Sequence, residues 1–223
     1  MYFLSHFFVD RNRNDPYFAV GTLIPDLATG FTKTYNSKIR NKSFDIKGNE
    51  AAIHQGILRH FELDKIFHTS PLFLHHCEKA KQQLIYNQLN RDKLRLSVIA
   101  HLAVEMLLDH WLILNFDEIT TSYYKLLQQV NVEILNSYLD KILPEVGKQR
   151  FLSNFMRFKE VEFLKYLEKP DGAVTGIVKT YEMATGVVFE KEEEEKLLRA
   201  LHNIKNDMRY SSEKLLDLNI SGR

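Results

Sequence analysis

Residues 94–114 form the stretch that most constrains how this chain can fold. Most of their side chains are apolar, which predicts a helix buried on nearly every side. The same stretch contains His101, Glu105 and Asp109, which share one helix face through their i, i+4, i+8 spacing, and then His110. Removing water from an ionised carboxylate costs several kcal/mol or more, so buried carboxylates are usually paired or bound to a metal.

A second polar stripe with the same spacing lies upstream and consists of His60, Asp64 and His68. Two helices that each present imidazole and carboxylate groups on one face supply the ligands of a metal site inside a helical bundle. The two stripes together therefore predict such a site.

Length and composition limit the class of protein. A chain of 223 residues, 44% hydrophobic, can bury a sizeable core, and we expect residues 1–223 to form one domain. The net charge of +1 argues against nucleic-acid binding. Cys77 is the one cysteine, which excludes an intrachain disulfide and favours a cytoplasmic location. Ionisable groups near the middle of residues 94–114 argue against membrane insertion.

The periodicity predicts an all-α fold, because no segment alternates apolar and polar residues in the manner of a strand. Asp15 and Pro16 have the pattern of a helix start, as do Ser70 and Pro71. We expect helices over residues 17–29, 49–67, 70–90, 91–116, 119–143 (as one or two helices), 146–167, 173–185 and 190–217, with a loop at 33–48 and a turn at 169–172. The expected architecture is a compact bundle around a central buried helix near 94–116.

Each candidate ligand also has a structural interpretation. His6, among aromatic residues, fits a core histidine bonded to the backbone, and Asp26 fits a helix cap after Pro25. The stripe that begins at His60 equally fits a solvated helix face. The stripe that ends at Asp109 favours a site, because so apolar a helix leaves little room for a solvated face.

The ligand types predict the kind of ion and the kind of chemistry. Histidines and carboxylates with almost no cysteine select Mn²⁺, Mg²⁺, Fe²⁺ or Zn²⁺ over metals that prefer thiolates. Such an ion favours hydrolysis, because it lowers the pKa of bound water and neutralises charge on a phosphoryl oxygen. The chain has no glycine-rich phosphate loop, no Gly-x-Ser-x-Gly and no His-Glu-x-x-His motif, so nothing supports nucleophilic serine or cysteine catalysis.

Four motifs together resemble the acyl carrier protein phosphodiesterase family in order and spacing. They are FLSH at 3–6, VGTLIPD at 20–26, GILRHFELDKIFHTSP at 56–71 and EMLLDHWL at 105–112. That family is similar to the HD-domain metal-dependent phosphohydrolases, and the resemblance covers about the first half of the chain. It implies an HD-like bundle, and a phosphoric diester hydrolase that removes the phosphopantetheine arm from holo acyl carrier protein.

The resemblance also assigns roles to residues. The implied metal ligands are Asp26, His60, Asp64, Glu105 and Asp109, around one or two ions with Mn²⁺ as the first expectation. The residues implied in proton transfer are His6, His68 and His110. Whether His101 is also a ligand stays open. Acyl carrier protein is the implied partner, and the basic segment at 33–47 either faces this acidic protein or is merely solvated.

The chain departs from the family's pattern at several motif positions. His68 and Glu105 stand where the family has Asp, and both keep a ligand group. Ser70 replaces a His, Phe61 replaces an Arg and Thr22 replaces an Asn. The lost His and Arg are groups that would hold phosphate or protonate a leaving group, so these changes bear on the substrate.

Two other functions compete with this one. The sequence around Asp26 and Asp109 also resembles that of zinc-dependent phospholipase C-like proteins, which suggests a phosphohydrolase acting on a small phosphoester or phospholipid. A non-catalytic helical binding protein, whose polar stripes hold a structural metal or a hydrogen-bond network, is the third possibility.

Overall fold

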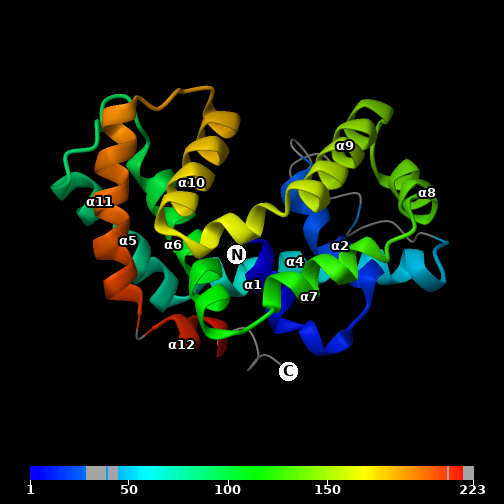
Figure 1. Ribbon diagram of the computed structural model, residues 1–223. Coiled ribbons are helices and arrows are strands. Elements are labelled where there is room, and N and C mark those ends of the chain that lie inside the picture. The colour runs from blue at the N-terminus through cyan, green and yellow to red at the C-terminus, as the bar shows by residue number, and fades with distance from the viewer. Residues whose placement is uncertain (29–38, 40–44, 210, 218–223) are drawn as a thin grey trace. The chain divides into compact units, whose positions relative to one another are not determined.

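Helices make up the regular structure of this protein wherever the chain is described (Figure 1). The computed structural model describes residues 1–28, 39, 45–209 and 211–217, and these residues contain no strand, which confirms the all-α class. The helices are α1 (Phe3–Val9), η1 (Arg11–Arg13), α2 (Pro16–Leu27), α4 (Gly48–Thr69), α5 (Pro71–Tyr86), α6 (Leu96–Asn115), α7 (Ile119–Gln128), α8 (Val132–Ile142), α9 (Glu145–Val161), η2 (Phe163–Glu168), α10 (Pro170–Thr185), α11 (Lys191–Met208) and α12 (Ser212–Asp217).

The chain divides into two compact units, each assembled from separate stretches of sequence. The first unit comprises Met1–Ser5, Lys65–Glu118 and Leu164–Arg223, and the second comprises His6–Asp64 and Ile119–Phe163. Helices α1 and α4 contribute residues to both units. The expectation that residues 1–223 form a single domain stays a prediction.

The first unit is built around α6, which is the central helix predicted from the sequence. Helices α5, α10 and α11 pack against it, and α11 also packs against α5 and α10 (Figure 1). Twelve of its residues are buried, including Glu105, Asp109 and His110. Within the described residues, α6 is the one helix long and apolar enough to cross a membrane. Of its apolar 18-residue stretch, 67% is buried inside the protein. A core helix explains that composition.

The second unit depends on a close crossing of α2 and α4 at a pair of glycines. A Cβ atom on Gly21 would collide with the carbonyl oxygen of Ile53, and one on Gly56 would collide with that of Phe18. Only glycine permits two helix backbones to approach so closely. The residues that follow each glycine, up to Asp26 on α2 and up to Asp64 on α4, carry the candidate ligands.

The two predicted helix starts are confirmed. Oδ1 of Asp15 accepts hydrogen bonds from the backbone nitrogens of Tyr17 (2.9 Å) and Phe18 (3.1 Å), and Pro16 opens α2. The hydroxyl of Ser70 accepts one from the backbone nitrogen of Phe73 at 3.2 Å, ahead of Pro71. These caps satisfy backbone donors that lack a partner within the helix.

Several of the expected boundaries are wrong. The helix expected over 70–90 ends at Tyr86, and the one expected over 91–116 begins at Leu96. The helix expected over 146–167 ends at Val161, because Glu162 adopts a left-handed backbone with φ of 49° and the chain continues as the 3₁₀ helix η2. The helix expected over 190–217 is two helices, α11 and α12. Pro170 begins α10 instead of forming a turn, since proline suits the first helical position. The loop expected at 33–48 falls mostly outside the described residues.

Candidate metal centre

Two groups of histidine and carboxylate side chains come together among the described residues. In the second unit, ligand atoms of His6, Asp26 and His60 all lie within 4.8 Å of one another. In the first unit, the same holds for His68, His101 and Glu105. We name the first group, together with the adjoining Asp64, the His6 cluster, and the second group the Glu105 cluster.

Three helices supply the His6 cluster. His6 lies on α1, Asp26 on α2, and both His60 and Asp64 on α4. The two oxygens of Asp64 face the two imidazoles, with Oδ1 at 3.2 Å from Nε2 of His6 and Oδ2 at 3.3 Å from Nε2 of His60. Oδ1 of Asp26 lies 3.7 Å from the same nitrogen of His60. The imidazoles stack with their ring centroids 4.1 Å apart.

A backbone carbonyl sets the orientation of His60. Its Nδ1 lies 2.8 Å from the carbonyl oxygen of Thr22. A carbonyl oxygen only accepts hydrogen bonds, so Nδ1 must carry the proton and donate it. In the neutral ring this leaves the lone pair of Nε2 directed at Asp26 and Asp64, which is the usual arrangement behind a metal-binding histidine.

His6 is buried without a hydrogen bond. Its side chain is 1% exposed, and neither ring nitrogen makes a hydrogen bond, although Nε2 faces Asp64. Burial and the neighbouring His60 lower the pKa of His6 to about 3, so the ring is neutral at physiological pH. Neutral imidazole is the form that binds a metal, and a buried polar group without a partner costs about 1–3 kcal/mol.

The carboxylates form the more accessible side of the His6 cluster. Burial alone raises the pKa of Asp64, but contacts with His6 and His60 outweigh it, so the pKa falls below its usual value. Burial likewise lowers the pKa of His60, and Asp26 and Asp64 reverse the effect and raise it. The side chains of Asp26 and Asp64 are 29% and 27% exposed, against 3% for His60. A ligand from solvent would meet the carboxylates first.

The Glu105 cluster centres on one buried carboxylate. Oε1 of Glu105 lies 2.9 Å from Nε2 of His68 and 3.3 Å from Nε2 of His101. The amino nitrogen of Met1 lies 2.9 Å from the same oxygen and 3.2 Å from Nε2 of His68. Burial raises the pKa of Glu105, whereas the amino group and the two imidazoles lower it more, so the pKa lies well below its usual value.

Asp109 and His110 lie outside both clusters. The carboxylate of Asp109 accepts hydrogen bonds from the backbone nitrogens of Leu4 and Ser5, each at 2.8 Å, and from the hydroxyl of Ser5. Burial nevertheless raises its pKa to about 7. Nδ1 of His110 donates to the carbonyl oxygen of Leu167 at 2.6 Å. Both side chains therefore have structural partners within the first unit.

The structure divides the ligands predicted from the sequence between the two units. Asp26, His60 and Asp64 belong to the second unit, and Glu105 and Asp109 to the first. The resemblance implied proton transfer for His6 and His68, but each lies among the ligand atoms of a cluster. His101, whose role as a ligand the sequence left open, belongs to the Glu105 cluster, and its i, i+4 spacing from Glu105 was the signal for it.

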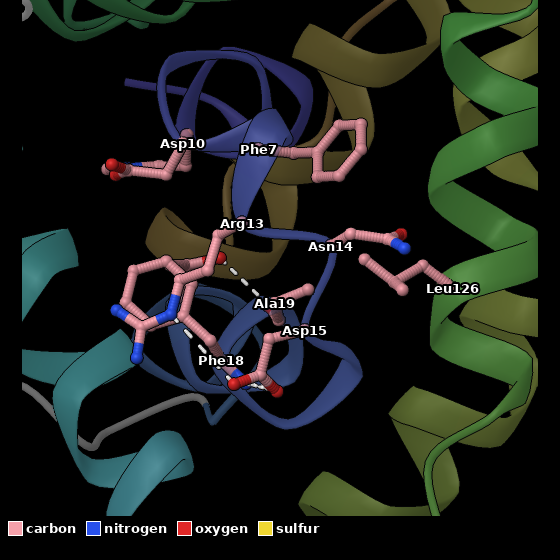
Figure 2. A pocket seen from close by; sticks show the side chains of 10 residues that line it. Phe7, Asp10, Arg13, Asn14, Asp15, Phe18, Ala19 and Leu126 are labelled. Carbon is pink, nitrogen blue, oxygen red and sulfur yellow. Dashed lines mark hydrogen bonds and ion pairs between the residues drawn. The ribbon is translucent and has the colours of Figure 1, made fainter.

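A small pocket in the second unit borders His6. Figure 2 shows several of its ten lining residues, with polar side chains from Asp10, Arg13, Asn14 and Asp15. Its volume of about 10 Å³ has room for roughly one water molecule. It is too small to bind a substrate.

No protein-family model, curated protein or solved structure matches this chain.

Proposed function

We propose that this protein is a metal-dependent phosphodiester hydrolase whose ion is bound by the His6 cluster. The observation that carries the proposal is the convergence of two imidazoles and two carboxylates from α1, α2 and α4. The buried His6 ring, which makes no hydrogen bond, supports it, because a metal ion would satisfy that ring.

The ligand set fits a divalent ion. Two nitrogen and two oxygen ligands without a thiolate suit Mn²⁺, Fe²⁺ or Zn²⁺, and Mg²⁺ less well, and we keep Mn²⁺ as the first choice. When bound, the ion would activate water and neutralise charge on the phosphoryl group. In this proposal His6 is a ligand and not a proton carrier, because its ring is almost fully buried.

The chain's own residues hold and orient the ligands. Asp64 bridges the two imidazoles, and Thr22 fixes the ring of His60 through its carbonyl oxygen. Gly21 and Gly56 allow α2 to lie close enough to α4 for Asp26 to reach the cluster. The partial exposure of both carboxylates leaves an approach for a phosphodiester.

The substrate within the proposal is the phosphodiester that joins phosphopantetheine to a serine of holo acyl carrier protein. Water would add to phosphorus and the bond to the serine oxygen would break, which leaves a free serine hydroxyl and phosphopantetheine. An HD-like arrangement of the helices and a cytoplasmic location belong to the same proposal. The basic segment at 33–47, offered as the surface for the acidic partner, lies largely outside the described residues.

Arg59 does not replace the arginine that the family carries after its histidine. Its guanidinium contacts Oδ2 of Asp10 at 2.8 Å and Oε2 of Glu62 at 2.7 Å, so two carboxylates already bind it. Phe61 and Ser70 stand in place of the family's Arg and His, and together with the engaged Arg59 they favour a second candidate function. That function is hydrolysis of a smaller phosphoester or a phospholipid by the same cluster.

A direct test uses metal-free protein reconstituted with Mn²⁺. We expect it to convert holo to apo acyl carrier protein, which mass spectrometry detects as loss of the phosphopantetheine arm. Asp64→Asn should reduce the rate by about 100-fold or more, because even residues that only orient metal ligands contribute 10–100-fold. Glu62→Gln, an equivalent change on an exposed position of α4, is the control and should keep full activity.

Three results would count against the proposal in different ways. Hydrolysis of nitrophenyl phosphodiesters or phospholipids, but not of holo acyl carrier protein, would replace the substrate and keep the site. Equal rates for Asp64→Asn and Glu62→Gln would exclude the His6 cluster as the active site. Failure to bind any ion would leave a non-catalytic helical protein.

A further inference from the structure

We infer that the first unit contains a second metal site of its own, in which His68, His101 and Glu105 bind a borderline transition ion, with Zn²⁺ as the first choice. This inference does not depend on the proposed hydrolase function. It rests on the geometry, packing and charge of the Glu105 cluster.

Two ligand-atom distances in the cluster are close to those of a tetrahedral zinc site, and the three ligand atoms lie within 4.8 Å of one another. Nitrogen and oxygen ligands about 2.1 Å from Zn²⁺ lie roughly 3.4 Å from one another in a tetrahedron. Nε2 of His101 lies 3.3 Å from Oε1 of Glu105, and Nε2 of His68 lies 2.9 Å from it. Small rotations of three side chains therefore place the ligand atoms around one ion.

Packing already orients both imidazoles. The ring of Phe73 lies with its centroid 5.2 Å from that of His68 and 5.1 Å from that of His101. Phe73 is 2% exposed, so its buried ring restricts the positions of both imidazoles. His101 and Glu105 share one face of α6, one turn apart. A site with its ligands held in place loses little conformational entropy when it binds an ion.

The charge at the centre of the cluster favours a cation. The side chain of Glu105 is 8% exposed, and a buried carboxylate needs a positive partner. The amino nitrogen of Met1 contacts both Glu105 and His68, so these ligand atoms already face a positively charged group. A divalent ion would displace this amino group from the carboxylate and supply more charge in its place.

The ligand set also indicates which ion the cluster prefers. Two histidines and one glutamate are a known protein ligand set for Zn²⁺, and three protein ligands leave a fourth position for water. The His6 cluster has one more carboxylate and is the harder of the two sites. The side chains of His68 and His101 are 31% and 40% exposed, so the Glu105 cluster can be reached from solvent.

Metal titration of the full chain tests the inference without an activity assay. We expect metal-free protein to bind about two equivalents of Zn²⁺ in calorimetry, and His101→Gln to bind one fewer or to lose at least 100-fold in affinity at one site. Glu105→Gln should behave in the same way. His202→Gln, an exposed histidine on α11, is the matched control and should bind as the wild type does.

Co²⁺ substitution adds a signature that a purely structural role would not produce. Absorption bands from Co²⁺ at the Glu105 cluster should disappear in His101→Gln and persist in His60→Gln. Retention of every zinc equivalent and every cobalt band by both His101→Gln and Glu105→Gln would overturn the inference.

The titrations can reject the hydrolase site or the second metal site without rejecting the other. A wild-type protein that binds one equivalent, lost in His101→Gln and kept in His60→Gln, would support this second site and remove the hydrolase site. The opposite pattern would remove the second site alone. Circular dichroism of each variant at the titration temperature shows whether lost binding reflects lost folding.

Discussion

The His6 cluster and the Glu105 cluster both consist of histidine and carboxylate side chains, but a different kind is buried in each. In the His6 cluster both imidazoles are buried, and the carboxylates of Asp26 and Asp64 are partly exposed. In the Glu105 cluster the carboxylate is buried and the two imidazoles are partly exposed. Helix α4 supplies both clusters at four-residue spacing, so spacing alone does not produce the difference.

Burial decides which kind of group in each cluster depends most on a partner. In the His6 cluster it leaves a neutral imidazole without a hydrogen bond. In the Glu105 cluster it leaves an anion that needs a cation, and the amino group of Met1 provides positive charge at 2.9 Å. The first arrangement offers a lone pair to a metal, whereas the second offers negative charge.

The largest expected effect comes from Asp109. It is the next carboxylate after Glu105 on the same face of α6, and the two differ in their partners. Asp109 has hydrogen bonds but no imidazole partner, and burial raises its pKa from 3.8 to about 7. The folded protein therefore keeps a proton that the unfolded chain releases. The stabilisation from this group is complete below pH 4 and is lost as the pH rises through 7.

The measurement is the free energy of unfolding of the wild type minus that of Asp109→Asn. This difference should fall by up to about 4 kcal/mol between pH 4 and pH 8. Asp117→Asn, at an exposed position after α6, is the control for loss of a carboxylate near the end of this helix. A flat difference between pH 4 and pH 8 would mean that Asp109 is ionised throughout this range and that burial does not raise its pKa.

A smaller effect should come from the crossing of α2 and α4 at Gly21 and Gly56, which positions ligands of the His6 cluster only. In Gly56→Ala the new Cβ would lie 2.8 Å from Cα of Gly21 and collide with the carbonyl oxygen of Phe18. Helix α2 must then move, and Asp26 moves with it. We expect a loss of about 3 kcal/mol in unfolding free energy and a weaker His6 cluster.

The control is Gly147→Ala on α9, where the nearest atom lies at 3.5 Å and alanine should stabilise the helix by up to about 1 kcal/mol. Calorimetric titration should show that Gly56→Ala retains zinc binding at the Glu105 cluster. Unchanged Mn²⁺ affinity at the His6 cluster would show that the crossing does not position its ligands.

The smallest expected effect tests whether burial of an imidazole without a hydrogen bond lowers the unfolding free energy. In metal-free protein, His6→Leu replaces a buried ring that makes no hydrogen bond and should raise the unfolding free energy by about 1 kcal/mol. The same change should abolish Mn²⁺ binding at that cluster. His101→Leu removes a partner of the buried Glu105 carboxylate and should lower the unfolding free energy instead. Thermal unfolding in a chelator measures both, and a destabilised His6→Leu would break the comparison.

The sequence by itself determined the helical class, the central helix and the polar faces. Apolar periodicity identified α6, with its end one residue and its start five residues from the expected 91–116, and Asp15 and Ser70 marked helix starts correctly because a cap is a local interaction. The i, i+4 spacing also identified the pairs His60–Asp64 and His101–Glu105, since helix geometry alone places such residues together.

Only the tertiary structure decided which members of each stripe converge. Asp109 shares a face with Glu105, yet it binds the backbone of Leu4 and Ser5, more than 100 residues away in sequence. His6 joins His60 through a stacking contact across 54 positions, which no periodicity reveals. Periodicity fixes the face of a helix on which a residue lies, whereas long-range packing fixes what that face meets, and the ligand set depends on both.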